Sequence, residues 1–250
     1  MDWKLSKSIY ITVFLIINIV LLIVLYNQYN IQERHESSRS QSISKSADYK
    51  TNVDALRNIK LSVLNGVQQE FQSETGADQS GTIRNIVEVK DLELDATIVK
   101  AHIDKEIYRG SEYTFDSESS TSDTIYYNQM YDSLPIFNIS AARIKVVRAS
   151  DNTLRFEQGY ISNITVNEYS KKVQVNDPIK LAEELAQEKV ISNEAIIKSS
   201  TLGHYVVLLN DEDQQVLLRP KWKLVIEEDD RTRIIYVDAI NASEEIIEGE

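Results

Sequence analysis

His102, Asp104 and Glu106 are the residues whose types and spacing come closest to a site for chemistry. Apolar residues alternate with them between positions 99 and 107, which is the pattern of a strand with one buried face. The three side chains are then expected on one side of that strand, where an imidazole and two carboxylates could ligate a metal ion. The alternative, which we favour, is the solvated face of an edge strand without a metal.

No other pattern among the 250 residues supports catalysis. The chain has no cysteine, which excludes thiolate zinc sites, disulfides and cysteine nucleophiles. It also lacks the glycine-flanked serine of hydrolases, the paired histidines of zinc proteases and a phosphate loop. The net charge of −12 argues against sequence-independent binding of nucleic acid, which needs basic stripes. We therefore predict a protein that is not an enzyme, with no catalytic residue, no metal or other cofactor, and no nucleic-acid partner.

Residues 9–26 give the strongest signal for architecture, because these 18 positions carry no charge. As a helix they would extend roughly 27 Å, close to the thickness of the hydrocarbon core of a bilayer. A cleaved signal peptide is the alternative, since Lys4 and Lys7 resemble its basic start. No small-x-small cleavage pattern follows Tyr26, so we predict a transmembrane helix that stays in place.

The charges around this segment predict its orientation. Two lysines precede it, whereas acidic and basic residues nearly cancel just after it, which favours a cytoplasmic N-terminus and an extracellular C-terminal domain. The predicted protein crosses the cell membrane once, and residues 27–250 carry a net charge of −13. Six serines among residues 37–46 predict a flexible tether. The predicted parts are a cytoplasmic tail (1–8), the transmembrane helix (9–26), a juxtamembrane Ser-rich linker (27–47), and N-terminal (48–127) and C-terminal (128–250) parts of the ectodomain.

The ectodomain is predicted to be α+β, strand-rich and mainly antiparallel. Asp177-Pro178 is a typical helix start, and apolar residues follow it at helical spacing. Short helices are also predicted at residues 53–63 and 193–199, and an exposed loop at 116–123. Strands are predicted at residues 204–209, 216–227 and 232–240. In the middle strand Trp222, Leu224 and Ile226 share one face, and Lys221 and Lys223 share the other.

Two groups of residues are candidates for contacts with other proteins. One is a stripe along the predicted membrane helix, with an amide near its middle: Ile11, Leu15, Asn18, Leu22 and Leu25. Its amide could bond to a second membrane helix, or it could be tolerated without a partner. The other group consists of tyrosines around the serine-rich loop: Tyr108, Tyr113, Tyr126, Tyr127 and Tyr131. Exposed tyrosines favour interfaces, and the alternative is that some of them are ordinary core residues.

Both ends of the chain resemble one protein family. The start Met-Asp-Trp-Lys, then Ser6-Lys7-Ser8-Ile9 and Leu15-Ile16-Ile17-Asn18-Ile19, is similar to the YycI (WalI) family. Pro220-Lys-Trp222 and Tyr236-Val-Asp-Ala-Ile-Asn241 agree with it, and this ending also resembles peptidase-propeptide-like (PepSY) modules. Residues 37–128 match by position alone. Ala242-Ser243-Glu244 stand where the family-like ending tends to have a glycine in the turn.

The resemblance implies a fold related to YycH-type domains and a non-catalytic accessory protein in Gram-positive bacteria. Such a protein modulates the sensor histidine kinase WalK (YycG) of an essential two-component system that governs cell-wall metabolism. The implied partners are this kinase and the sister protein YycH, reached through membrane and ectodomain contacts, and a homodimer or heterodimer is compatible with them. The alternative function is an extracytoplasmic PepSY-like module that binds peptides or inhibits a protease.

Overall fold

The computed structural model describes residues 14, 18, 43–53, 59–69, 71, 85–137, 140–149, 152–209, 214–229, 231–241 and 246–249. The chain divides into two compact units, Met1–Ser42 and Ile43–Glu250. In the first unit, Phe14 and Asn18 are described, and both are helical. The rest of the predicted membrane helix lies outside the described residues. Among those that are described, no helix is long and apolar enough to cross a membrane.

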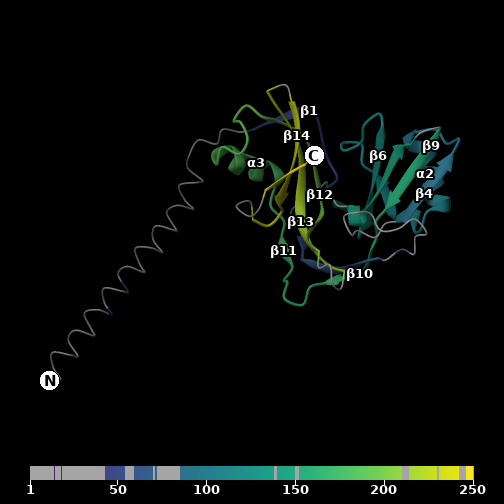
Figure 1. The fold of residues 1–250 in the computed structure, drawn as a ribbon. Coiled ribbons are helices and arrows are strands. Elements are labelled where there is room, and N and C mark those ends of the chain that lie inside the picture. The colour runs from purple at the N-terminus through teal and green to yellow at the C-terminus, as the bar shows by residue number, and fades with distance from the viewer. Residues whose placement is uncertain are drawn as a thin grey trace, which may run out of the picture. The chain divides into compact units, whose positions relative to one another are not determined.

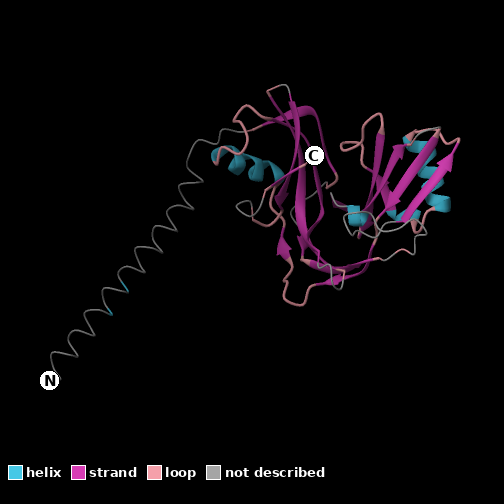
Figure 2. Ribbon diagram, viewed as in Figure 1, coloured by secondary structure: helices cyan, strands magenta, loops and turns pink. Residues whose placement is uncertain are grey.

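The second unit is rich in β-strands and has few helices (Figures 1 and 2). Its described α-helices are α2 (Ala96–Glu106) and α3 (Pro178–Gln187), and short 3₁₀ turns lie at Gly110–Glu112 and Ser140–Ala142. Its described strands are β1 (Ser44–Thr51), β2 (Lys60–Leu61), β3 (Leu64–Gln68), β4 (Asn85–Lys90), β5 (Tyr113–Phe115), β6 (Thr124–Tyr131), β7 (Leu134–Phe137), β8 (Arg143–Arg148), β9 (Thr153–Gln158), β10 (Ile161–Val166), β11 (Val173–Gln174), β12 (Ile196–Leu209), β13 (Gln215–Glu228), β14 (Arg231–Asp238) and β15 (Ile247–Glu248).

Thirteen of these strands form one hydrogen-bonded sheet, whose main path is β10-β3-β13-β12-β7-β6-β8-β9-β4. Strands β1, β5, β14 and β15 pair beside this path, and β2 and β11 form a separate pair. Among the described strands, β12 pairs in parallel with β1 and with β7, and the other pairings are antiparallel. The predicted strand-rich, mainly antiparallel fold is therefore confirmed.

The long strands at the C-terminal end pack one face against α3 (Figure 1). Asp177 caps this helix by accepting a hydrogen bond from the Ile179 backbone N–H, and Pro178 occupies its first turn, as predicted. Leu181 and Leu185 of α3 are buried in one cluster with Trp222. Burial of this apolar stripe and of alternate β13 side chains holds the helix on the sheet.

A second cluster lies between α2 and the sheet of β4, β6, β8 and β9. The strand predicted over residues 99–107 is wrong, because residues 99–106 belong to α2 and Ile107 is its C-cap. Val99, Ile103 and Ile107 are four positions apart, so they also share one face of a helix, and that face is buried. Asp95 favours the helix because it caps the N-terminus. Its carboxylate accepts hydrogen bonds from the backbone N–H groups of Thr97 and Ile98, at 2.8 and 3.0 Å.

Two shorter predicted helices are also wrong wherever the structure describes them. Residues 59–63 are extended and include β2, and residues 196–199 begin β12. Residues 44–47 of the predicted linker belong to β1, because its backbone pairs with the first part of β12. The predicted division at 127/128 falls inside β6, and the division of the ectodomain stays a prediction.

Candidate functional site

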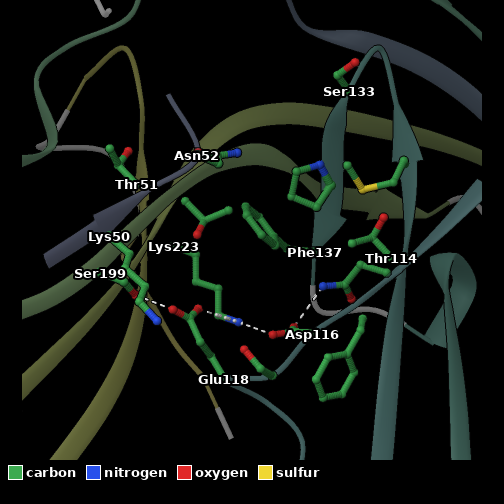
Figure 3. A pocket seen from close by; sticks show the side chains of 16 residues that line it. Lys50, Thr51, Asn52, Thr114, Asp116, Glu118, Ser133, Phe137, Ser199 and Lys223 are labelled. Carbon is green, nitrogen blue, oxygen red and sulfur yellow. Dashed lines mark hydrogen bonds and ion pairs between the residues drawn. The ribbon is translucent and has the colours of Figure 1, made fainter. Parts of the chain in front are cut away.

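A cleft of about 330 Å³ lies where the two halves of the large sheet meet around β12 and β13 (Figure 3). Strands β1 and β7 both pair with the same side of β12, at different points along it. Between these points the Asn52 side chain continues the pairing, because it donates to the Leu202 carbonyl and accepts from the Leu202 N–H. The cleft is lined by Lys50, Thr51, Asn52, Thr114, Phe115, Asp116, Ser117, Glu118, Asn128, Met130, Ser133, Pro135, Phe137, Ser199, Thr201 and Lys223.

A buried ion pair forms one wall of the cleft. The Lys223 ammonium lies 2.7 Å from Oδ1 of Asp116, and the two side chains are only 2% and 7% exposed. Asn128 Nδ2 and the Ser119 hydroxyl donate to the other carboxylate oxygen, at 2.8 and 2.9 Å. Burial alone would raise the pKa of the Asp116 carboxyl, but the charge of Lys223 and these hydrogen bonds outweigh it and lower that pKa below its ordinary value.

Glu118 extends this pair toward β12. Its Oε2 atom lies 3.2 Å from the Lys223 ammonium, and its Oε1 accepts a short hydrogen bond from the Ser199 hydroxyl. The ammonium also donates to the Ser119 hydroxyl, at 3.2 Å. Its three N–H groups therefore all have acceptors. In this arrangement Lys223 is a structural cation that ties the 116–119 turn to the sheet, rather than a nucleophile or a general base.

The predicted exposed loop at residues 116–123 needs a correction at its first residue. The segment is a loop, but Asp116 is buried because Lys223 draws its carboxylate against the sheet. Sequence reasoning placed Lys221 and Lys223 on one face of a strand without recognising that this face is also buried. Two lysines inside an otherwise apolar strand were the available signal, because lysine is rarely buried without a partner.

The structure separates the residues of the candidate metal triplet. Side chains two positions apart on an α-helix point about 200° apart around its axis, so Asp104 lies on the opposite side of α2 from His102 and Glu106. Asp104 pairs with Lys100, Glu106 pairs with Lys105 at 2.8 Å, and the His102 ring packs on Phe156. Within the described residues, no three or more histidine, aspartate or glutamate side chains are grouped as metal ligands.

The five tyrosines do not form one surface. Tyr113 and Tyr127 are buried in the cluster beneath α2, where their hydroxyls donate to the carbonyls of Gly159 and Ala96. These two are core residues, so their assignment to an exposed interface is corrected. Tyr108 is 46% exposed, and Tyr126 and Tyr131 are half-buried. An interface role for these three stays a prediction.

Of the predicted membrane stripe, the structure describes Asn18. Its side-chain amide donates to the Phe14 carbonyl one turn earlier, at 2.8 Å. This bond uses one of the two N–H donors of the amide group. Ile11, Leu15, Leu22 and Leu25 lie outside the described residues.

His204 is a buried titratable residue that does not line the cleft. It lies in β12 opposite Pro220 of β13, its ring meets that of Tyr131, and its Nδ1 atom has no partner among the described residues. Burial lowers the pKa of His204 to about 4, from its ordinary value of 6.5. The imidazole is therefore neutral in the folded protein over the whole physiological range.

This pKa predicts an acid-sensitive component of stability. The unfolded chain takes up the proton near pH 6.5 and the folded chain only near pH 4, so stability falls as the pH drops through this window. Between pH 7 and pH 4 the native protein should lose up to about 3 kcal/mol more than a His204→Phe variant. Urea unfolding of both proteins across this range measures the difference. Parallel pH profiles would contradict a neutral, buried imidazole.

The fold and the cleft define a strand-rich α+β domain whose buried charges tie its parts together. The family model described as YycI protein matches residues 27–240. The chain therefore belongs to the YycI family, as its two ends indicated. This family is a regulatory accessory family associated with two-component systems and is not a known enzyme family.

Comparisons with other proteins add little. No curated protein matches the chain. Among solved structures, an uncharacterized protein from Eubacterium rectale is similar with a TM-score of 0.38 and 6% sequence identity. The match covers 63% of this chain and 56% of that one, so the chain spans little more than half the length of that protein.

Proposed function

We propose that this chain is a non-catalytic, membrane-anchored accessory protein that modulates the sensor histidine kinase of a cell-wall-regulating two-component system. Its membership of the YycI family, through a match over residues 27–240, is the observation that carries this proposal. The proposed partners are the kinase WalK (YycG) and the sister protein YycH. Contacts change the activity of a kinase only if they differ between its signalling states, so the accessory protein must bind one state better than the other.

The proposed location is the cell membrane. Residues 9–26 would span it, with residues 1–8 in the cytoplasm and residues 27–250 outside the cell. The uncharged run of 18 residues and the two lysines before it support this topology. The ectodomain would follow as a strand-rich body from Ile43 onward, with residues 27–42 between it and the membrane.

The proposed contacts lie in both compartments. In the membrane, the amide of Asn18 keeps one N–H and its carbonyl oxygen for a neighbouring helix, since its other N–H bonds to Phe14. Outside, the exposed ring of Tyr108 and the half-buried rings of Tyr126 and Tyr131 are the tyrosines still available for a partner. The cationic Arg143 guanidinium lies 3.7 Å from the centroid of the Tyr126 ring and holds that ring in place.

Replacing Asn18 tests the membrane contact. An Asn18→Leu variant should insert normally, because leucine is favoured in lipid, but should recover about threefold to eighteenfold less kinase, since one interhelical hydrogen bond contributes about 0.6–1.7 kcal/mol. The measurement is the amount of kinase that co-purifies with the tagged full-length protein from detergent-solubilised membranes. Leu22→Ala is the matched control for a change on the same predicted stripe without loss of a polar group.

Membrane insertion is checked on the same variants by cysteine labelling, which the absence of natural cysteines makes specific. Ser122→Cys, at an exposed position of the ectodomain, should react with an impermeant maleimide in intact cells, and Ser6→Cys should not. Recovery of no histidine kinase with the unaltered protein would overturn the proposed function. Labelling of Ser6→Cys in intact cells would overturn the proposed topology.

A further inference from the structure

The polar groups that line the cleft fall into two sets. Lys223, Asp116, Glu118 and Ser199 are bonded to one another. In contrast, the ammonium of Lys50 and the hydroxyls of Thr114, Ser133 and Thr201 have no hydrogen bond or ion pair within the described part of the chain. The groups without partners are available to bind a ligand. The groups bonded to one another hold the walls of the cleft in place.

Lys50 supplies a positive charge on an exposed side chain that lines the cleft. It stands at the end of β1, in register with Ser199 of β12, and Asn52 anchors the following turn through two hydrogen bonds to Leu202. Figure 3 shows Lys50 and Thr51 on the side of the cleft away from Thr114. A lysine without an ion pair among the described residues favours a carboxylate ligand.

Asn128 supplies an acceptor. Its Nδ2 atom must face Asp116, because an ionised carboxylate only accepts hydrogen bonds, and the 2.8 Å contact fixes the amide in that orientation. Its Oδ1 atom is left buried and without a partner among the described residues. An unmade hydrogen bond of this kind is costly, so an N–H donor that enters the cleft would gain from reaching this oxygen after a small shift of the side chains that cover it.

The opposite wall is apolar. Phe137 and Pro135 of β7 are buried, while Met130 of β6 is partly exposed and Phe115 of β5 is 40% exposed. In Figure 3 the ring of Phe137 lies between the side chains of Lys223 and Thr114. Gly203 lets this wall approach β12, because a Cβ atom there would lie 2.4 Å from the Pro135 carbonyl oxygen. A cleft of about 330 Å³ with this lining suits a small apolar group carrying a few polar atoms.

We propose that the cleft binds an apolar amino-acid residue that has a free carboxylate and an acylated N–H. The carboxylate would pair with Lys50. The N–H would donate to Asn128 Oδ1, and the side chain would pack on Phe137 and Met130. The C-terminal residue of a peptide and a free N-acyl amino acid share this chemistry. The site adds a ligand to the proposed regulatory protein and does not depend on its contacts with a kinase.

Met130 provides a direct reporter, because the chain has only one other methionine, Met1. Full-length protein carrying ¹³C-methyl methionine in detergent micelles should give two methyl signals. Titration with N-acetyl-leucine should shift the Met130 signal and leave that of Met1 in place, with a dissociation constant on the order of 1 mM for a ligand of this size. N-acetyl-leucinamide, which lacks the charge, should bind at least about fivefold more weakly.

Two further measurements test whether binding depends on Lys50 and which of the two ligand sources is preferred. Lys50→Gln should weaken N-acetyl-leucine binding about fivefold, whereas Lys45→Gln, a matched change on the same strand, should not alter it. N-acetyl-alanyl-leucine that binds more tightly than N-acetyl-leucine would identify peptide ends as the ligand, and equal affinity would identify free N-acyl amino acids. A Met130 signal unmoved at about 20 mM probe, or equal binding by the amide or by Lys50→Gln, would overturn the proposal.

Discussion

A Lys223→Met substitution should lower the free energy of unfolding by about 3–5 kcal/mol. Methionine fills a similar volume, so little packing is lost, but the Asp116 carboxylate would remain buried without its counter-charge. Folding would then have to protonate this carboxyl group or expose it. The measurement is urea unfolding of the full-length protein at neutral pH, followed by circular dichroism.

Two companion variants separate charge burial from general damage. Asp116→Asn combined with Lys223→Met removes both charges and should recover at least half of the loss, because Ser119 and Asn128 can still bond to an amide. Lys198→Met breaks the exposed Lys198–Glu227 pair and should cost no more than about 1 kcal/mol. If the Lys223 and Lys198 variants lost equal stability, the buried pair would have no special role.

A Trp222→Ala substitution acts on the opposite face of the same strand and should cost about 3–5 kcal/mol. The indole is fully buried, and its Nε1 atom donates to the Asn176 carbonyl, at 3.1 Å. Asn176 directly precedes the Asp177 cap of α3 and bonds to the Ala239 and Ile240 carbonyls. The substitution therefore leaves a cavity and also removes one of the three hydrogen bonds that hold Asn176, at the start of the helix, to the sheet and the residues that follow it.

Trp222→Phe is the matched control for this prediction. It keeps most of the apolar volume and removes the N–H donor, so it should cost about 1–2 kcal/mol. Circular dichroism in urea measures both variants without depending on tryptophan fluorescence. Equal losses in the two variants would show that the hydrogen bond, rather than the packed ring, dominates the contribution of Trp222.

The C-terminal half of the fold could be predicted because local patterns there point to one answer. Asp177-Pro178 is compatible with a helix start, and the alternation around Trp222 fits a strand better than a helix. Residues 99–107 were ambiguous, since Val99, Ile103 and Ile107 lie on one face in both a strand and a helix. The capping carboxylate of Asp95 resolved this ambiguity, and its position four residues before the first buried side chain was a readable signal.

The candidate site could not be predicted by the same means. Asp116 and Lys223 are 107 residues apart, and their contact depends on how β6, β7, β12 and β13 are ordered in the sheet. No local periodicity contains this information. The serine-rich composition after Asp116 also favoured an exposed loop. Instead, Ser119 bonds to the buried carboxylate, Ser120 bonds to the Asp116 backbone carbonyl, and Glu118 pairs with the lysine.

Strand β1 has a mechanical consequence. It is the first element after residue 42, and its far end carries Lys50, Thr51 and Asn52 into the cleft. The hydrogen bonds between the parallel strands β1 and β12 lie across the strand axis. Tension applied along the chain from residue 42 would therefore act on all of these bonds at once, in shear, instead of breaking them one after another.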